Sequence, residues 1–135
     1  MSIEFPFLYF NIESIGRIFR PLIPVSLKTI KGWQTFHFIV DTGSDLTTLP
    51  HRFIKVLGID VKKCRKGEAE GLGGYRSRTL QVEIPIKVKN YETVIRASMV
   101  EDDKTPLLLG RVDLLDDKFS WFFDTKRKKI IFEEI

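Results

Sequence analysis

The chain has 135 residues, of which 43% are hydrophobic and 30% charged, and its formal net charge is +4. This composition excludes a largely disordered chain and fits one globular domain, which we expect to span residues 1–135. Cys64 is the only cysteine, so an intrachain disulfide is excluded and a cytoplasmic location is expected. The apolar start, residues 1–12, is shorter than a membrane span and contains Glu4 and Pro6. We therefore interpret it as a strand and expect no membrane association.

Runs of aromatic and β-branched residues predict that most of the chain forms β-strands. The predicted strands span residues 5–12, 22–29, 33–40, 80–88, 91–100, 119–123 and 130–134. Two short helices are predicted, one over residues 50–57 that ends at Gly58 and one over residues 110–118. In the second helix, Val112 is expected on the buried side and Asp113 on the exposed side. The pattern predicts an all-β protein with short helices.

A polar turn, Asp41-Thr42-Gly43-Ser44-Asp45, lies between two apolar runs at residues 36–40 and 46–50. Flanking strands would hold the first carboxylate at the mouth of a core, where it is not solvated like a surface acid. The glycine leaves room for backbone N–H groups to point at that carboxylate. Asp-Thr-Gly also occurs by chance in ordinary turns, so this pattern needs corroboration from the rest of the chain.

Two further motifs follow this turn. Residues 70–75, Glu-Gly-Leu-Gly-Gly-Tyr, form the tip of a predicted projecting hairpin over residues 67–78. Within residues 106–115 an apolar strand runs into Gly110 and then Arg111. Taken in this order, the three motifs resemble those of the retropepsin-like aspartic peptidases, the single-lobed relatives of pepsin. The motifs frame a core over residues 36–117.

The resemblance implies a single-lobed acid-protease fold, a closed β-barrel with short helices that is active as a homodimer. Asp41 would be the catalytic residue of an aspartic endopeptidase. Water would be activated between two Asp41 carboxylates, one from each subunit, and would hydrolyse a peptide bond. The Asp-Thr-Gly signature occurs once, because Asp124-Thr125 is followed by Lys126. The second carboxylate must therefore come from a second copy of the chain.

The same resemblance assigns supporting roles to the neighbours of the catalytic acid. Thr42 would hydrogen-bond to the backbone of the partner subunit, and Gly43 would contribute backbone contacts. The Ser44 hydroxyl would donate a hydrogen bond to the ionised carboxylate. Asp45 would form a partly buried ion pair with Arg111 and brace the turn.

The glycine-rich tip would act as a flap over a bound peptide or protein substrate. Leu72 would close over the substrate, and Gly71, Gly73 and Gly74 would permit contact between the flap backbone and the peptide. Considered without the other two motifs, the same residues predict only a plain glycine-rich turn.

Two other functions stay open. A non-catalytic peptide-binding module of the same fold would keep the cleft but never assemble the pair of acids, and a chain that fails to dimerise would favour it. A nucleic-acid-associated protein would use the basic clusters at residues 62–66 and 126–129. These clusters lack interleaved aromatic residues, so no nucleic-acid partner is expected. No metal or other cofactor is expected, because His37 and His51 are the only histidines and are not at ligand spacing.

The terminal segments, residues 5–12 and 119–134, have no partner within the motif-bearing core. We interpret them as candidates for a sheet shared between two subunits, which would hide their edges. The alternative is that they complete the sheet of their own chain.

Overall fold

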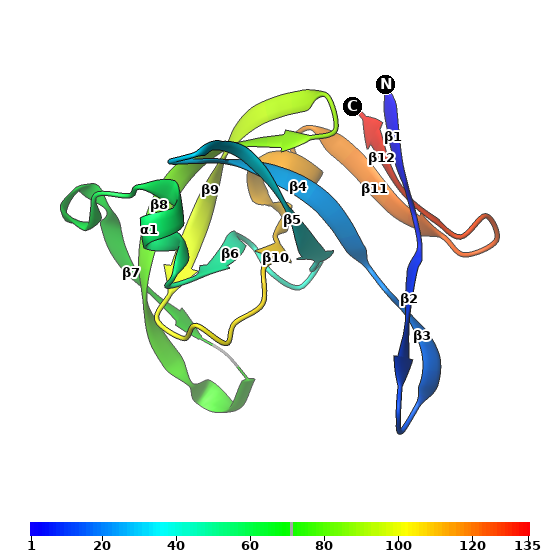
Figure 1. Ribbon diagram of the computed structural model, residues 1–135, viewed down its shortest axis with the longest axis horizontal. Coiled ribbons are helices and arrows are strands. Elements are labelled where there is room, and N and C mark those ends of the chain that lie inside the picture. Colours follow the sequence, from blue (N-terminus) through cyan, green and yellow to red (C-terminus); the bar gives the residue numbers. More distant parts are fainter. Residues whose placement is uncertain (71) are drawn as a thin grey trace.

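The computed structural model describes residues 1–70 and 72–135 and is built mainly from strands (Figure 1). The strands are β1 (Ser2–Pro6), β2 (Leu8–Ile12), β3 (Gly16–Arg20), β4 (Leu22–Thr29), β5 (Gly32–Val40), β6 (Thr47–Pro50), β7 (Arg65–Glu70), β8 (Arg76–Val88), β9 (Tyr91–Val100), β10 (Leu108–Leu109), β11 (Phe119–Asp124) and β12 (Lys129–Glu134). The helical elements are α1 (Phe53–Leu57) and the short turns η1 (Val61–Lys63), η2 (Leu72–Gly74) and η3 (Arg111–Leu115). Among the described residues, no helix is both long and apolar enough to cross a bilayer.

The central sheet closes on itself, which confirms the predicted closed barrel. Its strands follow the order β4-β5-β10-β6-β9-β8-β7, and β4 also pairs with β8. The closing contact joins Ser26 to Lys87 and Leu27 to Ile86 in antiparallel register. Strand β7 lies outside the ring and extends β8 into a hairpin that projects from the body (Figure 1).

Alternating burial along the barrel strands fills the interior with aliphatic side chains. In β4, Ile23, Val25 and Leu27 are buried, while the residues between them are less buried. Phe38 of β5 and Leu49 of β6 are fully buried against them. Each side chain of this kind contributes about 1.5–3 kcal/mol when it leaves water. The loops at the barrel mouth are therefore attached to a firmly packed body.

The terminal segments form a sheet of their own within one chain. Strands β1, β12 and β11 are antiparallel, in that order, and Ile3 pairs with Phe132. Phe5, Phe119 and Phe132 are buried where this sheet meets the barrel. The two termini lie side by side (Figure 1). In a single chain these segments thus pair with each other, which is the alternative to a sheet shared between subunits.

The single strand predicted over residues 5–12 is wrong, because the chain breaks at Phe7. The N–H of Phe7 donates to the carbonyl of Lys128, and the next five residues leave the terminal sheet as β2. Strand β2 pairs with β3 to form a separate two-stranded hairpin. Strand β3 is not among the strands predicted from the sequence, and its five residues include Gly16 and two arginines.

The first predicted helix begins later than expected. Pro50 is the last residue of β6 and pairs with Val100 of β9, so α1 starts only at Phe53. The predicted end at Gly58 is confirmed, because this glycine adopts a left-handed conformation with φ of 65° and closes the helix.

The helix predicted over residues 110–118 is wrong. The segment η3 is one wide turn, in which the N–H of Asp116 donates to the carbonyl of Arg111. Val112 is extended, with φ −68° and ψ 140°, and Asp113 has a positive φ of 74°. The amphipathic pattern misled the prediction because tertiary contacts, rather than helical periodicity, determine which side chains are buried.

Asp113 is held by a bidentate ion pair rather than exposed. Its carboxylate accepts hydrogen bonds from Nε of Arg96 at 2.8 Å and from Nη2 at 3.0 Å. It also accepts the backbone N–H of Arg96 at 2.9 Å, which fastens η3 to β9. These hydrogen bonds from the Arg96 side chain lower the pKa of Asp113, against the opposing effect of partial burial.

This pair makes one contribution to stability that depends on pH. A carboxyl group whose pKa is lowered by folding stabilises the fold above its unfolded pKa of about 4 and loses that contribution as the pH falls through its folded value. Asp113→Asn keeps a residue that tolerates positive φ but removes the charge. We expect the variant to melt below wild type at pH 7, and the difference in Tm to shrink below about pH 4. Thermal unfolding followed by circular dichroism measures this; a difference that stays constant down to pH 2 would contradict the assignment.

Candidate active site

Asp41 follows β5 and is anchored by backbone hydrogen bonds on both sides of that strand. Its N–H donates to the carbonyl of Leu109 at 3.0 Å, and the N–H of Val40 donates to the carbonyl of Pro21 at 2.8 Å. Strands β5 and β10 run parallel here, with Val40 opposite Leu109. The carboxylate therefore begins its turn from a strand end that cannot shift without breaking the sheet.

Within the turn, one expected contact to the Asp41 carboxylate is present and another is not. The N–H of Gly43 donates to Oδ1 of Asp41 at 3.0 Å, as the sequence analysis predicted. The Ser44 hydroxyl instead donates to the carbonyl of Leu46 at 2.7 Å. The predicted hydrogen bond from Ser44 to the carboxylate is therefore wrong in the single chain, because the turn brings a backbone acceptor closer. Thr42 is exposed, so its predicted contact with a partner stays a prediction.

The far side of the turn is fastened to the strand-to-turn segment that begins at Gly110. The N–H groups of Arg111 and Val112 donate to the carbonyls of Ser44 and Asp45 at 3.0 and 2.9 Å. The N–H of Gly110 donates to Oγ1 of Thr47, whose side chain is buried. Sequence reasoning missed Thr47. Its signal is a hydroxyl at a buried position in a short strand, which must find a hydrogen-bond partner.

The predicted ion pair between Asp45 and Arg111 is present, but Asp45 is not buried. Nη2 of Arg111 lies 2.6 Å from Oδ1 of Asp45, and Nη1 lies 3.0 Å from Oδ2 of Asp116. The Asp45 side chain is 78% exposed, so the expected partial burial is wrong for this residue in the single chain. Exposed pairs contribute about 0.2–1 kcal/mol. The arginine therefore serves mainly to join the Asp41 turn to η3.

A groove of about 630 Å³ lies next to this turn. One wall is the turn itself, from Gly43 to Leu46, and another is formed by residues of the β7–β8 hairpin, including Glu68, Ala69 and Ser77. Val100 and further residues of β9 and the loop after it complete the lining. This volume is within the range of about 300–1,000 Å³ that is typical of ligand-binding clefts.

The β7–β8 hairpin carries the predicted flap. Its strands pair antiparallel up to Glu70 and Arg76, so the predicted projecting hairpin is confirmed. Gly73 and Gly74 in η2 have φ of 79° and 78°, a conformation that other residues rarely adopt. Gly71 lies outside the described residues. Closure of this hairpin over a substrate stays a prediction.

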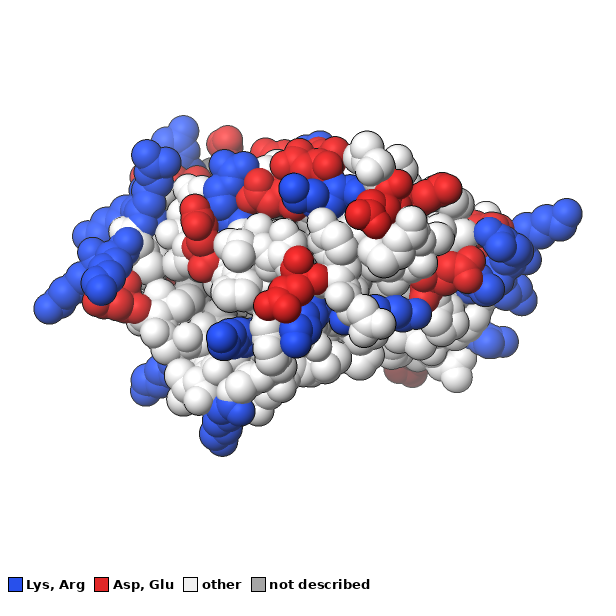
Figure 2. Space-filling model, turned by 90° about the horizontal axis from the view of Figure 1, so that it is seen from above, with Lys and Arg blue, Asp and Glu red and all other residues white. Residues whose placement is uncertain are grey.

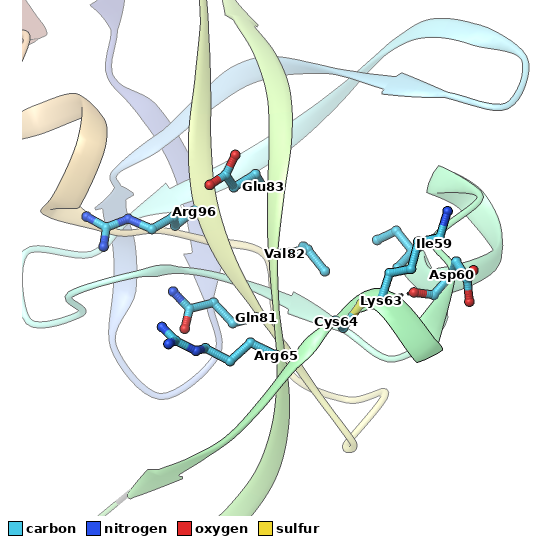
Figure 3. A pocket seen from close by; sticks show the side chains of 9 residues that line it. All are labelled: Ile59, Asp60, Lys63, Cys64, Arg65, Gln81, Val82, Glu83 and Arg96. Atoms are coloured by element: carbon cyan, nitrogen blue, oxygen red, sulfur yellow. Dashed lines mark hydrogen bonds between the residues drawn. The ribbon is translucent and has the colours of Figure 1, made fainter.

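A second hollow, of about 560 Å³, is lined by residues of a different region (Figure 3). One side of it is formed by Arg65, Gln81 and Arg96. The other side is formed by the segment that joins α1 to β7, which contains Cys64. Burial, and to a smaller extent the charge of Asp60, raises the pKa of the Cys64 thiol. A protonated thiol is a poor nucleophile, so the raised pKa of Cys64 gives no support for cysteine-based catalysis in this hollow.

The distribution of surface charge tests the alternative of a nucleic-acid-binding protein. Figure 2 shows Lys and Arg gathered mainly at the two ends of the molecule, with acidic side chains between them. The described residues on this face therefore form no continuous basic stripe that could follow a phosphate backbone. No group of three or more described His, Cys, Asp or Glu residues is placed to hold a metal ion.

The closed barrel, the doubly anchored Asp-Thr-Gly turn and the adjoining groove define a single-lobed aspartic protease fold. Residues 28–115 match the family model described as "gag-polyprotein putative aspartyl protease". This match spans more than half of the chain, so the chain belongs to this retropepsin-like family.

The whole fold also has a solved counterpart. A crystal structure of a retropepsin-like aspartic protease from Rickettsia conorii superposes with a TM-score of 0.64 and 17% sequence identity, and the match covers 97% of this chain and 98% of that one. At this identity the likeness shows the fold alone. No curated protein sequence matches the chain. Family membership and fold together support a protease function.

Gly110 provides a direct test of how the turn is held. A methyl group there would overlap the carbonyl carbon and oxygen of Leu46 and lie 2.7 Å from the carbonyl oxygen of Asp45. Because all three are backbone atoms, we expect Gly110→Ala to lower the free energy of unfolding by about 1–3 kcal/mol. Gly43→Ala is the matched control, since its new methyl would meet only Oδ1 of Asp41 at an ordinary 3.4 Å. Urea denaturation of both variants measures the effect, and equal stabilities would overturn this account of the turn.

Proposed function

We propose that the chain is an aspartic endopeptidase that works as a symmetric homodimer, with Asp41 from each subunit forming the catalytic pair. The observation that carries the proposal is the Asp41 turn itself. It is anchored at both ends by backbone hydrogen bonds, and its residues 43–46 line a groove whose other wall is the β7–β8 hairpin. It contributes one Asp41 carboxylate per chain. Peptide hydrolysis by the aspartic-protease mechanism uses two carboxyl groups that share one proton.

The proposed reaction divides two tasks between the two Asp41 carboxyl groups. The ionised carboxylate removes a proton from water while the protonated carboxyl group donates a hydrogen bond to the carbonyl oxygen of the substrate. The water oxygen then bonds to the carbonyl carbon. A proton passes to the amide nitrogen as the C–N bond breaks, which gives a carboxylic acid and an amine. Two carboxylates this close cannot both ionise, so the pair holds the single proton that the mechanism requires.

A twofold axis supplies the second carboxylate in the simplest way. In an isologous dimer each copy offers the same surface, so the two Asp41 turns meet face to face. The chain carries a single Asp-Thr-Gly turn within 135 residues. A monomer would hold the groove and half of the catalytic pair.

We assign the groove between residues 43–46 and the β7–β8 hairpin to the substrate. A peptide in extended conformation would hydrogen-bond through its backbone to the walls, and its side chains would occupy the hollows between them. The hairpin would act as the flap, because its tip contains glycines and projects from the body (Figure 1).

Asp41→Asn tests the catalytic assignment. The amide keeps the size of the side chain but cannot take a proton from water, so we expect an intact fold and at least about a hundredfold loss of cleavage. Asp117→Asn is the matched control, because Asp117 is exposed and lies outside the groove. Cleavage of a diverse peptide library measures the effect. If Asp41→Asn cleaves as fast as wild type, the assignment is wrong.

Mixing the two proteins tests whether the site is shared. An excess of Asp41→Asn chains should inhibit wild type, because mixed dimers contain only one functional acid. The same excess of Asp117→Asn chains should not inhibit. Undiminished activity of wild type in the presence of the Asp41→Asn chains, at concentrations where subunits exchange, would exclude a shared catalytic pair.

The pH dependence tests the single shared proton. Only the singly protonated pair can perform both tasks, so kcat/KM should pass through a maximum at acidic pH, within about pH 3 to 6. Initial rates on one peptide across this range measure the profile. A rate that rises steadily through pH 8 would indicate a different catalytic group.

A further inference from the structure

The β2–β3 hairpin is an element that the proposed function does not use. It pairs Leu8 with Arg20 and Ile12 with Gly16, and it projects from the lower right of the body in the view of Figure 1. A two-stranded hairpin is marginally stable in water unless one face packs against something else. The two faces of this hairpin differ in what covers them.

One face is packed against its own chain. The ring of Phe19 stacks on Phe7 with 3.7 Å between centroids and meets Phe123 of β11 edge-on at 5.9 Å. Tyr9 lies on the same face, opposite Phe19, and the guanidinium of Arg17 lies over its ring. This face is therefore fixed to the terminal sheet.

The other face is apolar and only partly covered: Leu8, Ile12 and Ile18 are half-buried, and Phe10 is exposed. Cross-strand pairing places Leu8, Phe10, Ile12 and Ile18 together on it. None of these side chains belongs to the hydrophobic core or to the described apolar residues packed against it. Phe10 is 38% exposed, and the guanidinium carbon of Arg20 lies 5.8 Å from the centroid of its ring. We call this surface the arm face, and the β2–β3 hairpin the arm.

The base of the arm adjoins the catalytic turn. Strand β3 leads through Pro21 into β4, and the carbonyl of Pro21 accepts the N–H of Val40, the residue before Asp41. In the proposed dimer the twofold axis passes between two Asp41 carboxylates that share a proton, and so lie about 3 Å apart. Each arm therefore starts a few residues from the axis. Its five-residue strands extend about 17 Å from there.

We propose that the arm face packs against the partner subunit in the homodimer. The proposal rests on the dimer of the proposed function. An apolar face that begins close to a twofold axis lies within reach of the partner subunit, which could bury it. A bound peptide is the less suitable occupant, because no residue of the arm lines the groove formed by residues 43–46 and the β7–β8 hairpin. The arm of each subunit would then pack against the other subunit close to the two Asp41 residues.

Phe10→Thr with Ile18→Thr tests the proposal. Threonine keeps β-propensity but removes the apolar contact, so the dimer dissociation constant should rise at least about tenfold. Tyr9→Thr, on the opposite face of the same hairpin, is the matched control and should change it less than about threefold. The double variant and the control are both made in the Asp41→Asn background to prevent self-cleavage. Their dimer dissociation constants are measured by sedimentation equilibrium. A dissociation constant of the double variant equal to that of the Asp41→Asn parent would overturn the proposal.

Hydrogen exchange tests the same proposal without any substitution in the arm. Hydrogen exchange of the Asp41→Asn protein above and below its dissociation constant should show the amides of residues 8–12 and 16–20 protected more strongly in the dimer. Equal exchange at both concentrations would overturn the proposal even if the double variant does not fold. If the dimer depends on the arm but the wild-type protein cleaves no peptide, only the proposed function is refuted. If the protein cleaves peptides as a dimer whose dissociation constant is unchanged by the arm substitutions, only the proposed role of the arm is refuted.

Discussion

The position of the Asp41 carboxylate depends on the close approach of Gly110 to the backbone of Asp45 and Leu46. No side chain fits between them, so the strand that carries Leu109 can bond to Asp41 on one side while Gly110 bonds to Thr47 on the other. The barrel holds both segments through fully buried aliphatic residues. The turn is consequently fixed before any substrate or partner arrives, which is the pre-organisation that catalysis requires.

Around this turn the single chain exposes features that the proposed dimer would cover. Asp45 is mostly exposed, Thr42 is exposed, and the arm beside the turn has an apolar face that is only partly covered. All three features lie at the same end of β5. A partner copy centred on Asp41 would cover them together, so the chemical requirement for a second acid and the physical requirement to bury apolar surface favour the same assembly.

The sequence predicted the barrel strands and the central turn well, because alternating burial and an Asp-Thr-Gly turn between apolar runs are local signals. Errors arose where distant contacts override local preference. Residues 110–118 read as an amphipathic helix, yet the ion pair of Asp113 with Arg96 holds that residue at positive φ. The break at Phe7 depends on a carbonyl more than a hundred residues away, at Lys128. Neither partner can be inferred from neighbouring residues.

The central claim is that one chain carries half of an active site. Its most direct test is to measure peptide cleavage per chain and the dimer fraction, by sedimentation velocity, across a dilution series of the wild-type protein. The account predicts that activity per chain falls in proportion to the dimer fraction, because monomers contain one Asp41 only. Cleavage per chain that stays constant while the protein sediments as a monomer would contradict it.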